Sequence, residues 1–77
     1  MRYIKLPLII EDEAEQTVVL NLNPFTIESY YSAVYFYKDE DALSKEVTVI
    51  HCKSGISYDI MLNIDDFEKI HNKFMAQ

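Results

Sequence analysis

The sequence has few of the residues that cross-link very small domains. Among its 77 residues Cys52 is the only cysteine, so neither an intrachain disulfide nor a zinc site with several thiolates can form. A domain of this size buries only about 60% of the surface of its unfolded chain. Its stability must therefore come from packing, and the lone thiol fits a reducing, cytoplasmic setting.

Long apolar runs are also missing. No apolar stretch approaches the roughly 20 residues that a membrane-spanning helix needs. The N-terminal residues lack the basic flank and apolar run of a signal peptide. We therefore expect one cytoplasmic domain covering residues 1–77, without membrane attachment.

Basic residues are scarce, with 7 Lys and Arg against 13 Asp and Glu and a formal net charge of -6. Because phosphate binding depends on clustered cations, nucleic acid is not expected as a partner. We interpret the acidic residues as two solvated turns and a helix start, with imitation of a DNA backbone as the alternative. The clusters are Glu11, Asp12, Glu13 and Glu15; Asp39, Glu40 and Asp41; and Asp65, Asp66 and Glu68.

Apolar and polar residues alternate in the N-terminal part of the chain, which is typical of strands with one buried face. Residues 4–10 form the first predicted strand, and residues 18–22 form a second that is close enough to complete a hairpin. Pro7 removes one ladder donor. The first strand is therefore expected at a sheet edge, or paired only through its other side.

Residues 26–38 are rich in β-branched and aromatic side chains and contain no Gly or Pro, which predicts one long strand. Both of its faces are apolar, with Tyr31, Ala33 and Tyr35 on one side and Tyr30, Val34 and Phe36 on the other. After a polar turn at 39–45, strands are predicted at 46–53 and 56–62. Gly55 supplies positive φ in the tight turn between them.

The C-terminal residues predict a helix. Asn63 is a suitable N-cap, and Asp65 and Asp66 place negative charge in the first turn, where the helix dipole favours it. The apolar stripe of this helix comprises Phe67, Ile70 and Phe74. The predicted fold is mainly β (α+β), an antiparallel five-stranded β-meander with one C-terminal helix.

Assembly is also predicted from this pattern. One short helix covers part of one sheet face, yet the third and fourth strands are apolar on both sides. Exposed apolar patches and open sheet edges are usually covered or paired. We therefore expect a homo-oligomer formed by sheet packing or by edge pairing.

A family resemblance covers roughly residues 17–74. It rests on VLNLNP at 19–24, IES at 27–29, VTVI at 47–50, the turn with Gly55, and the acidic cap and short helix that follow. These features resemble the small FlbD-type proteins of flagellar operons, which have look-alikes in phage and mobile-element genomes. The resemblance implies a compact β-rich protein with an accessory or regulatory binding role and no catalytic activity. The first strand and the longer turn at 39–45 depart from the family pattern and leave a phage accessory protein as an alternative.

The sequence contains no enzyme motif. It has no glycine-rich phosphate loop, GxSxG or HExxH. His51 and Cys52 are adjacent, so in a strand they point to opposite faces and cannot form a nucleophile pair. Cys52 is expected to be a small buried hydrophobe and His71 a boundary residue. A metal site from His51, Asp59 and His71 is conceivable but not required by the spacing, and no cofactor or catalysis is expected.

Tyrosines and a few polar residues suggest a ligand site at an oligomer interface. Tyrosine offers a flat stacking surface with a polar tip, and a nearby lysine can hold a phosphate. The alternative is that these tyrosines simply pack within the sheet and the interface. The candidate ligand-binding residues are Tyr31, Tyr35, His51, Lys53, Ser54 and Tyr58.

The leading functional hypothesis is a non-catalytic, oligomeric binding module, a phage or bacterial accessory protein that modulates a partner protein. One alternative is a phage protein that sequesters a nucleotide-like signal and so blocks host defence. A second alternative is an acidic DNA mimic.

Overall fold

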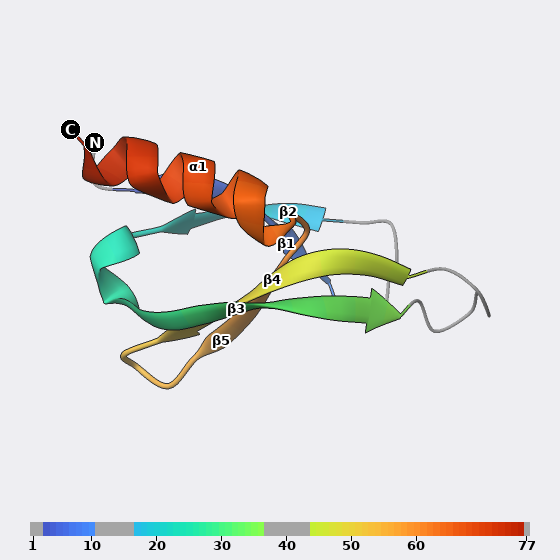
Figure 1. Ribbon diagram of the computed structural model, residues 1–77. Helices are drawn as coiled ribbons and strands as arrows, with labels where there is room; N and C mark the ends of the chain where they lie inside the picture. Colours follow the sequence, from blue (N-terminus) through green and yellow to red (C-terminus); the bar gives the residue numbers. More distant parts are fainter. Residues whose placement is uncertain (1–2, 11–16, 37–43, 77) are drawn as a thin grey trace.

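The computed structural model describes residues 3–10, 17–36 and 44–76 (Figure 1). Within these ranges the chain forms five antiparallel strands and one α-helix, which confirms the predicted fold class. The elements are β1 Ile4–Ile9, β2 Thr17–Leu22, the 3-10 helix η1 Pro24–Thr26, β3 Ile27–Phe36, β4 Ser44–Cys52, β5 Ser57–Ile60 and α1 Ile64–Met75.

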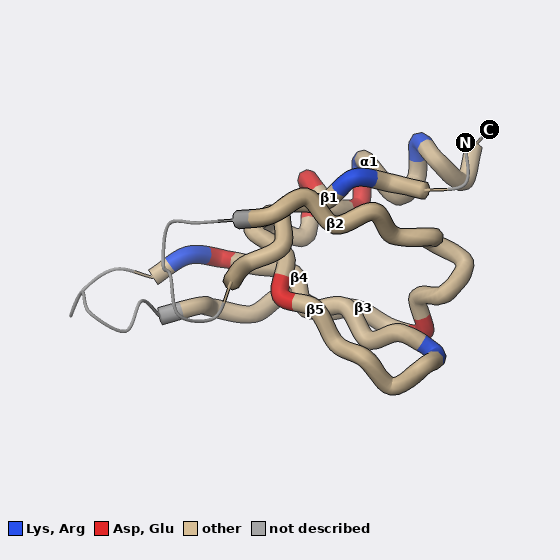
Figure 2. Tube along the Cα trace, turned by 180° about the vertical axis from the view of Figure 1, so that it is seen from behind, with Lys and Arg blue, Asp and Glu red and all other residues tan. Residues whose placement is uncertain are grey.

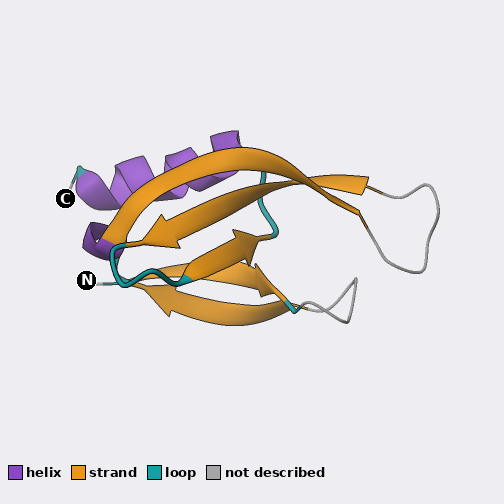
Figure 3. Cartoon of the chain, turned by 90° about the horizontal axis from the view of Figure 1, so that it is seen from below, coloured by secondary structure: helices purple, strands orange, loops and turns teal. Residues whose placement is uncertain are grey.

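The strands are arranged in the order β2-β1-β5-β4-β3. Consecutive strands are paired except β2 and β3, and the first strand is paired with the last. β1 therefore lies beside β5 inside the sheet, while β2 and β3 are the two edge strands (Figure 3). The chain passes from one edge to the other through η1.

The position of β1 in the sheet tests the expectation that was based on Pro7. β1 is an internal strand, so the expectation of an edge position was wrong. The Pro7 carbonyl accepts a hydrogen bond from the Met61 amide at 2.8 Å, on the β5 side. In an antiparallel ladder the N–H and C=O groups of one residue point to the same neighbouring strand. The N–H that Pro7 lacks would therefore also have pointed to the β5 side. β1 accordingly has a full ladder with β2 and one register pair, Leu8 with Ile60, with β5.

The start of β3 and the start of β4 differ from the prediction. Before the strand, Asn23 accepts a hydrogen bond from the Phe25 amide at 3.0 Å, and Pro24 occupies the first turn of η1, where its missing N–H costs nothing. The next strand, β4, begins at Ser44, earlier than predicted. Ser44 and Lys45 pair with the last residues of β3 and so extend the ladder. Ser44 and Lys45, predicted as part of the turn at 39–45, thus belong to β4, and residues 37–43 lie outside the described part of the chain.

The main core lies between the sheet and α1, which crosses one side of it (Figure 1). Phe67 is the helix residue at its centre and is 0% exposed. Its ring packs edge-on against Tyr30, with centroids 4.9 Å apart, so the Tyr30 side of β3 faces the helix. The buried core residues are Ile4, Leu6, Leu22, Ile50, Cys52, Ile60 and Phe67, which confirms the burial of the cysteine.

The face of the sheet away from α1 is also apolar, as the sequence predicts. The register pairs Tyr31 with Val49 and Ala33 with Val47, so these side chains share that face. Val47 is nevertheless only 2% exposed. The second face is therefore partly closed within a single chain, and Tyr31 is an exposed aromatic residue on it, at 49%.

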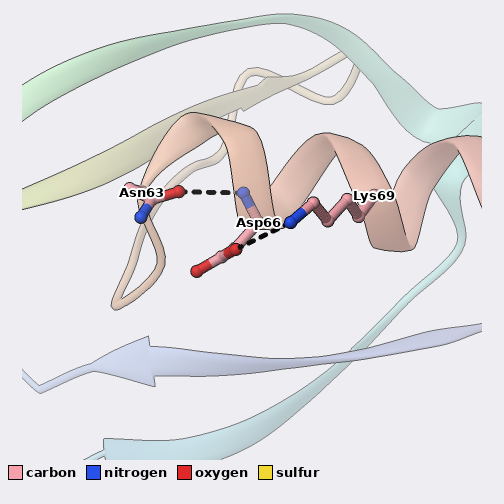
Figure 4. Close-up of polar contacts among 3 residues, drawn as sticks. All are labelled: Asn63, Asp66 and Lys69. Carbon is pink, nitrogen blue, oxygen red and sulfur yellow. Dashed lines mark hydrogen bonds and ion pairs between the residues drawn. The ribbon is translucent and has the colours of Figure 1, made fainter.

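The start of α1 forms as its sequence predicts (Figure 4). The Asn63 side chain accepts a hydrogen bond from the Asp66 amide at 2.8 Å, which satisfies one free N–H of the first turn. Asp66 also lies 3.8 Å from the Lys69 ammonium, an exposed ion pair that contributes little to stability. This acidic cluster belongs to a helix start, whereas those at 11–15 and 39–41 lie outside the described residues.

Candidate binding surface

Three neighbouring strands bring Tyr31, His51 and Ser57 together on the face away from α1. The rings of Tyr31 and His51 have centroids 5.4 Å apart and are inclined by 31°. His51 Nδ1 lies 2.6 Å from the Ser57 hydroxyl oxygen, within hydrogen-bond distance. We call these three residues the tyrosine–histidine cluster. It contains two of the residues predicted from sequence, and it presents a half-exposed stacking surface beside a polar pair.

The other predicted ligand residues are distributed unevenly. Tyr35 shares the face of Tyr31 but lies four residues further along β3 and is half-buried. Lys53 and Ser54 are exposed in the turn after β4, where Gly55 has the predicted positive φ of 91°. Tyr58 pairs with Ile50 and packs against the main core, so it lies on the opposite face from the tyrosine–histidine cluster.

Ser57 was missed because the register of the β4–β5 hairpin was not worked out from the turn. His51 and Ser57 are direct partners across this hairpin, which places their side chains on one face. This pairing results from a three-residue loop, Lys53 to Gly55, which is centred on Ser54 and is closed by the hydrogen bond from the Cys52 amide to the Ile56 carbonyl. The same register implies that Tyr58 points to the helix side.

The conceivable metal site does not form. His51 and Asp59 lie on the face away from α1, whereas His71 belongs to α1 and packs against Phe67 with ring centroids 5.7 Å apart. Among residues 3–10, 17–36 and 44–76, no group of three His, Cys, Asp or Glu side chains could hold a metal ion.

A groove lies on the helix side of the sheet, between η1, the first residues of β3 and the last turns of α1. Its volume is about 500 Å³, and most of its lining is apolar. It is lined by Pro24, Phe25, Ile27, Glu28, Ser29, Tyr30, His71 and Met75. Phe25 is 64% exposed and Met75 is also exposed. The Phe25 ring contacts Phe74 edge-on at 5.9 Å, which fixes one wall against the helix. We call this feature the η1 groove.

His71 gives the η1 groove one polar atom. Its Nδ1 is buried and has no hydrogen-bond partner within the described residues. Buried polar atoms in proteins are nearly always paired, so an unpaired one in the wall of a groove is unusual. Sequence reasoning missed this groove because its walls come from three separate segments, one of them the unexpected 3-10 helix.

Tyr30 is the titratable residue of this region with a shifted pKa. Its hydroxyl donates a hydrogen bond to Glu68 Oε2 at 3.2 Å. Burial raises the pKa of Tyr30 above its ordinary value of 10.0, and the hydrogen bond and the negative charge of Glu68 raise it further. The folded protein therefore favours neutral Tyr30.

This shift predicts a loss of stability at alkaline pH. The folded-state pKa of Tyr30 exceeds the unfolded one, so its contribution is complete below about pH 10 and disappears as the pH rises through the folded-state pKa. We expect Tyr30→Phe to reduce the drop in melting temperature between about pH 9 and about pH 11. Thermal unfolding followed by circular dichroism measures this, and equal drops in the two proteins would contradict the assignment.

The structure is that of a small α+β protein in which one helix covers an antiparallel sheet. The η1 groove lies on the helix side, and the tyrosine–histidine cluster lies on the other face. Comparisons with protein families, curated proteins and solved structures found no match to this chain. The FlbD-type assignment therefore stays a prediction from the sequence. In the described part of the chain, no helix has the length and apolar character needed to cross a membrane.

Proposed function

We propose that this protein is a non-catalytic binding module that docks an apolar segment of a partner protein in the η1 groove and so modulates that partner. The observation that carries the proposal is the exposure of Phe25 and Met75, two large apolar side chains that line one mainly apolar groove. Large exposed apolar side chains that gather around a concave surface are typical of protein interaction sites.

His71 supports a peptide-like occupant. The walls of the groove suit an apolar side chain, and a rotation of the His71 ring would bring its buried, unpaired Nδ1 to a neighbouring polar group of the same segment. A backbone amide or carbonyl next to an apolar side chain has this combination. The incoming segment would gain a hydrogen bond that the free protein lacks.

The biological setting of the proposal follows the family resemblance. FlbD-type proteins and their phage look-alikes imply an accessory role, so we place the protein in the cytoplasm as a phage or bacterial accessory protein. In this role it acts as a homo-oligomer, and the bound partner, not a reaction of its own, carries the biological effect.

The proposal is tested by two matched charge substitutions. Phe25→Asp places a carboxylate in the η1 groove, whereas Ile56→Asp places one on another exposed apolar residue, in the β4–β5 turn, which does not line the groove. Affinity-tagged wild-type and variant proteins are expressed in the source cells, and retained proteins are quantified by mass spectrometry. We expect one partner to fall by at least about tenfold with Phe25→Asp, equivalent to about 1.4 kcal/mol.

The Ile56→Asp variant is expected to retain the partner at the wild-type level, because its charge lies outside the groove. Circular dichroism confirms that both variants are folded. Equal retention by Phe25→Asp and wild type, or no protein retained by wild type, would refute docking in the η1 groove.

A second candidate function is the sequestering of a nucleotide-like small molecule, and the tyrosine–histidine cluster favours it. The Tyr31 ring offers a half-exposed stacking surface, and Lys53 lies two residues beyond His51 in the following turn. Native mass spectrometry of protein purified without denaturation would show a stoichiometric extra mass. Tyr31→Ala and Lys53→Ala should each remove that mass, while Tyr58→Ala, on the other face, should not.

A further inference from the structure

β3 is an edge strand that lacks the usual protection against pairing. It is ten residues long, lies at the end of the sheet, and carries Glu28 as its single charged residue. Natural edge strands are usually short, charged, or interrupted by proline. Figure 2 shows how sparse the charged positions are along the strands. Tyr31 and Val34 are both exposed, one on each face of this edge.

The outward backbone groups of β3 can be identified from its neighbours. The Cys52 amide donates to the Ile56 carbonyl across the β4–β5 hairpin, so Cys52 faces β5 and His51 faces β3. Antiparallel ladders alternate in this way, and His51 pairs with Ser29. The odd-numbered residues from Ser29 to Tyr35 therefore bond to β4. The N–H and C=O groups of Tyr30, Ser32 and Val34 point away from the sheet, where no described strand lies.

We infer that a second copy of this chain pairs with β3, antiparallel and centred on Ser32. In this register Ser32 lies opposite Ser32 of the copy, and Tyr30 lies opposite Val34. The free backbone N–H and C=O groups of one β3 strand therefore meet those of the other. An aromatic residue opposite a β-branched one is a favourable cross-strand pair. Glu28 falls opposite position 36, not opposite its own copy, so the pairing brings no like charges together.

The other edge strand is less suited to this contact. β2 has six residues against ten in β3, so it offers fewer ladder hydrogen bonds. A contact between β2 of one copy and β3 of the next would be heterologous and would grow into a ring or a filament. Self-pairing of β3 closes with two-fold symmetry, the commonest arrangement of soluble oligomers.

The inference specifies the oligomer on which the proposed function rests. It joins two sheets into one across β3, with both α1 helices on the same side. On the other side, Tyr31 of each copy lies beside Ala33 of its partner, so the two tyrosine–histidine clusters become neighbours on one surface. The η1 groove of each copy lies near the ends of the paired strands.

The first test compares oligomeric state in wild type and Ser32→Pro. Proline removes the outward N–H of Ser32 while the hydrogen bonds of β3 to β4 remain, because Ser32 does not donate to β4. Sedimentation over a dilution series should give a dimer for wild type and at least about a tenfold higher dissociation constant for Ser32→Pro. Ser32→Ala keeps the N–H and should behave as wild type.

The second test reads the register directly. Directly opposed residues that exchange hydrogen bonds have Cα atoms about 5.5 Å apart, which suits a disulfide. Ser32→Cys should therefore form a disulfide-linked dimer under mild oxidation, and Glu28→Cys, opposite position 36 in this register, should not. The wild-type protein, whose native Cys52 is buried in the main core, is the control for disulfides that do not involve the introduced cysteine.

A monomer at every concentration, a dimer unaffected by Ser32→Pro, or a growing ladder of larger species would overturn the inference. These outcomes are independent of the partner assay, since Phe25 lies in η1 and outside the paired residues. A monomer that still loses its partner with Phe25→Asp would refute β3 pairing alone. A β3 dimer that captures nothing would refute groove docking alone.

Discussion

Replacing Phe67 by alanine is expected to lower the free energy of unfolding by about 3 to 5 kcal/mol. The ring is fully buried at the centre of the main core, where it contacts Tyr30 and His71 from the helix side. The substitution removes its apolar contacts and leaves a cavity that the surrounding strands can close only in part. The total stability of native proteins is about 5 to 15 kcal/mol, so the loss would be a large fraction of it.

Urea unfolding followed by circular dichroism measures this loss, and the chain provides its own control. Phe25→Ala removes the same ring from a position that is 64% exposed and outside the core cluster. We expect a cost below about 1 kcal/mol there, because surface substitutions change stability little. Equal costs at the two positions would show that α1 does not pack on the sheet through Phe67.

Thr48→Val is expected to destabilise the fold by about 1 to 3 kcal/mol although the two side chains have nearly the same shape. Thr48 is the buried polar residue of the described core, and its hydroxyl donates to the Leu62 carbonyl at 3.0 Å. This bond ties β4 to the segment that leads into α1. Valine retains the packing and the strand propensity but leaves that carbonyl without its donor.

Thr26→Val is the matched control for this substitution. The Thr26 hydroxyl also donates to a backbone carbonyl, that of Asn23, but the bond is exposed and water can replace the donor. We expect the free energy of unfolding to change by less than about 0.5 kcal/mol. If Thr48→Val also left the free energy of unfolding in urea unchanged, the hydrogen bond between Thr48 and Leu62 would not contribute to stability.

The alternation of residues predicted the strands well because it acts locally. Ile50 and Cys52 are buried on the helix side while His51 between them faces the other way, as period two requires. The Asn63 cap likewise needs only residues within one turn of itself. Features that depend on a few adjacent residues could therefore be read from the sequence.

The closure of the sheet and the η1 groove could not be predicted in this way. The residue pattern of β1 does not predict that β5 is its second neighbour, because this pairing depends on how all five strands are arranged in the sheet. The groove depends on the direction in which η1 turns the chain between β2 and β3. The face of Tyr58, one of the predicted ligand residues, could not be predicted for a related reason, since the hairpin register places it opposite Ile50 and away from Tyr31 and His51.

The pairing of β1 with β5 has a consequence for biosynthesis. Leu8 is made early and Ile60 late, yet they are register partners in the finished sheet. Until β5 has emerged from the ribosome, β1 and β2 form at most a two-stranded hairpin, which is marginally stable in water. Its apolar side, with Ile4 and Leu6, has nothing to pack against during that interval. The sheet is therefore expected to close only after β5 has been made, more slowly than a helical chain of equal length folds, and the early strands need protection from aggregation until then.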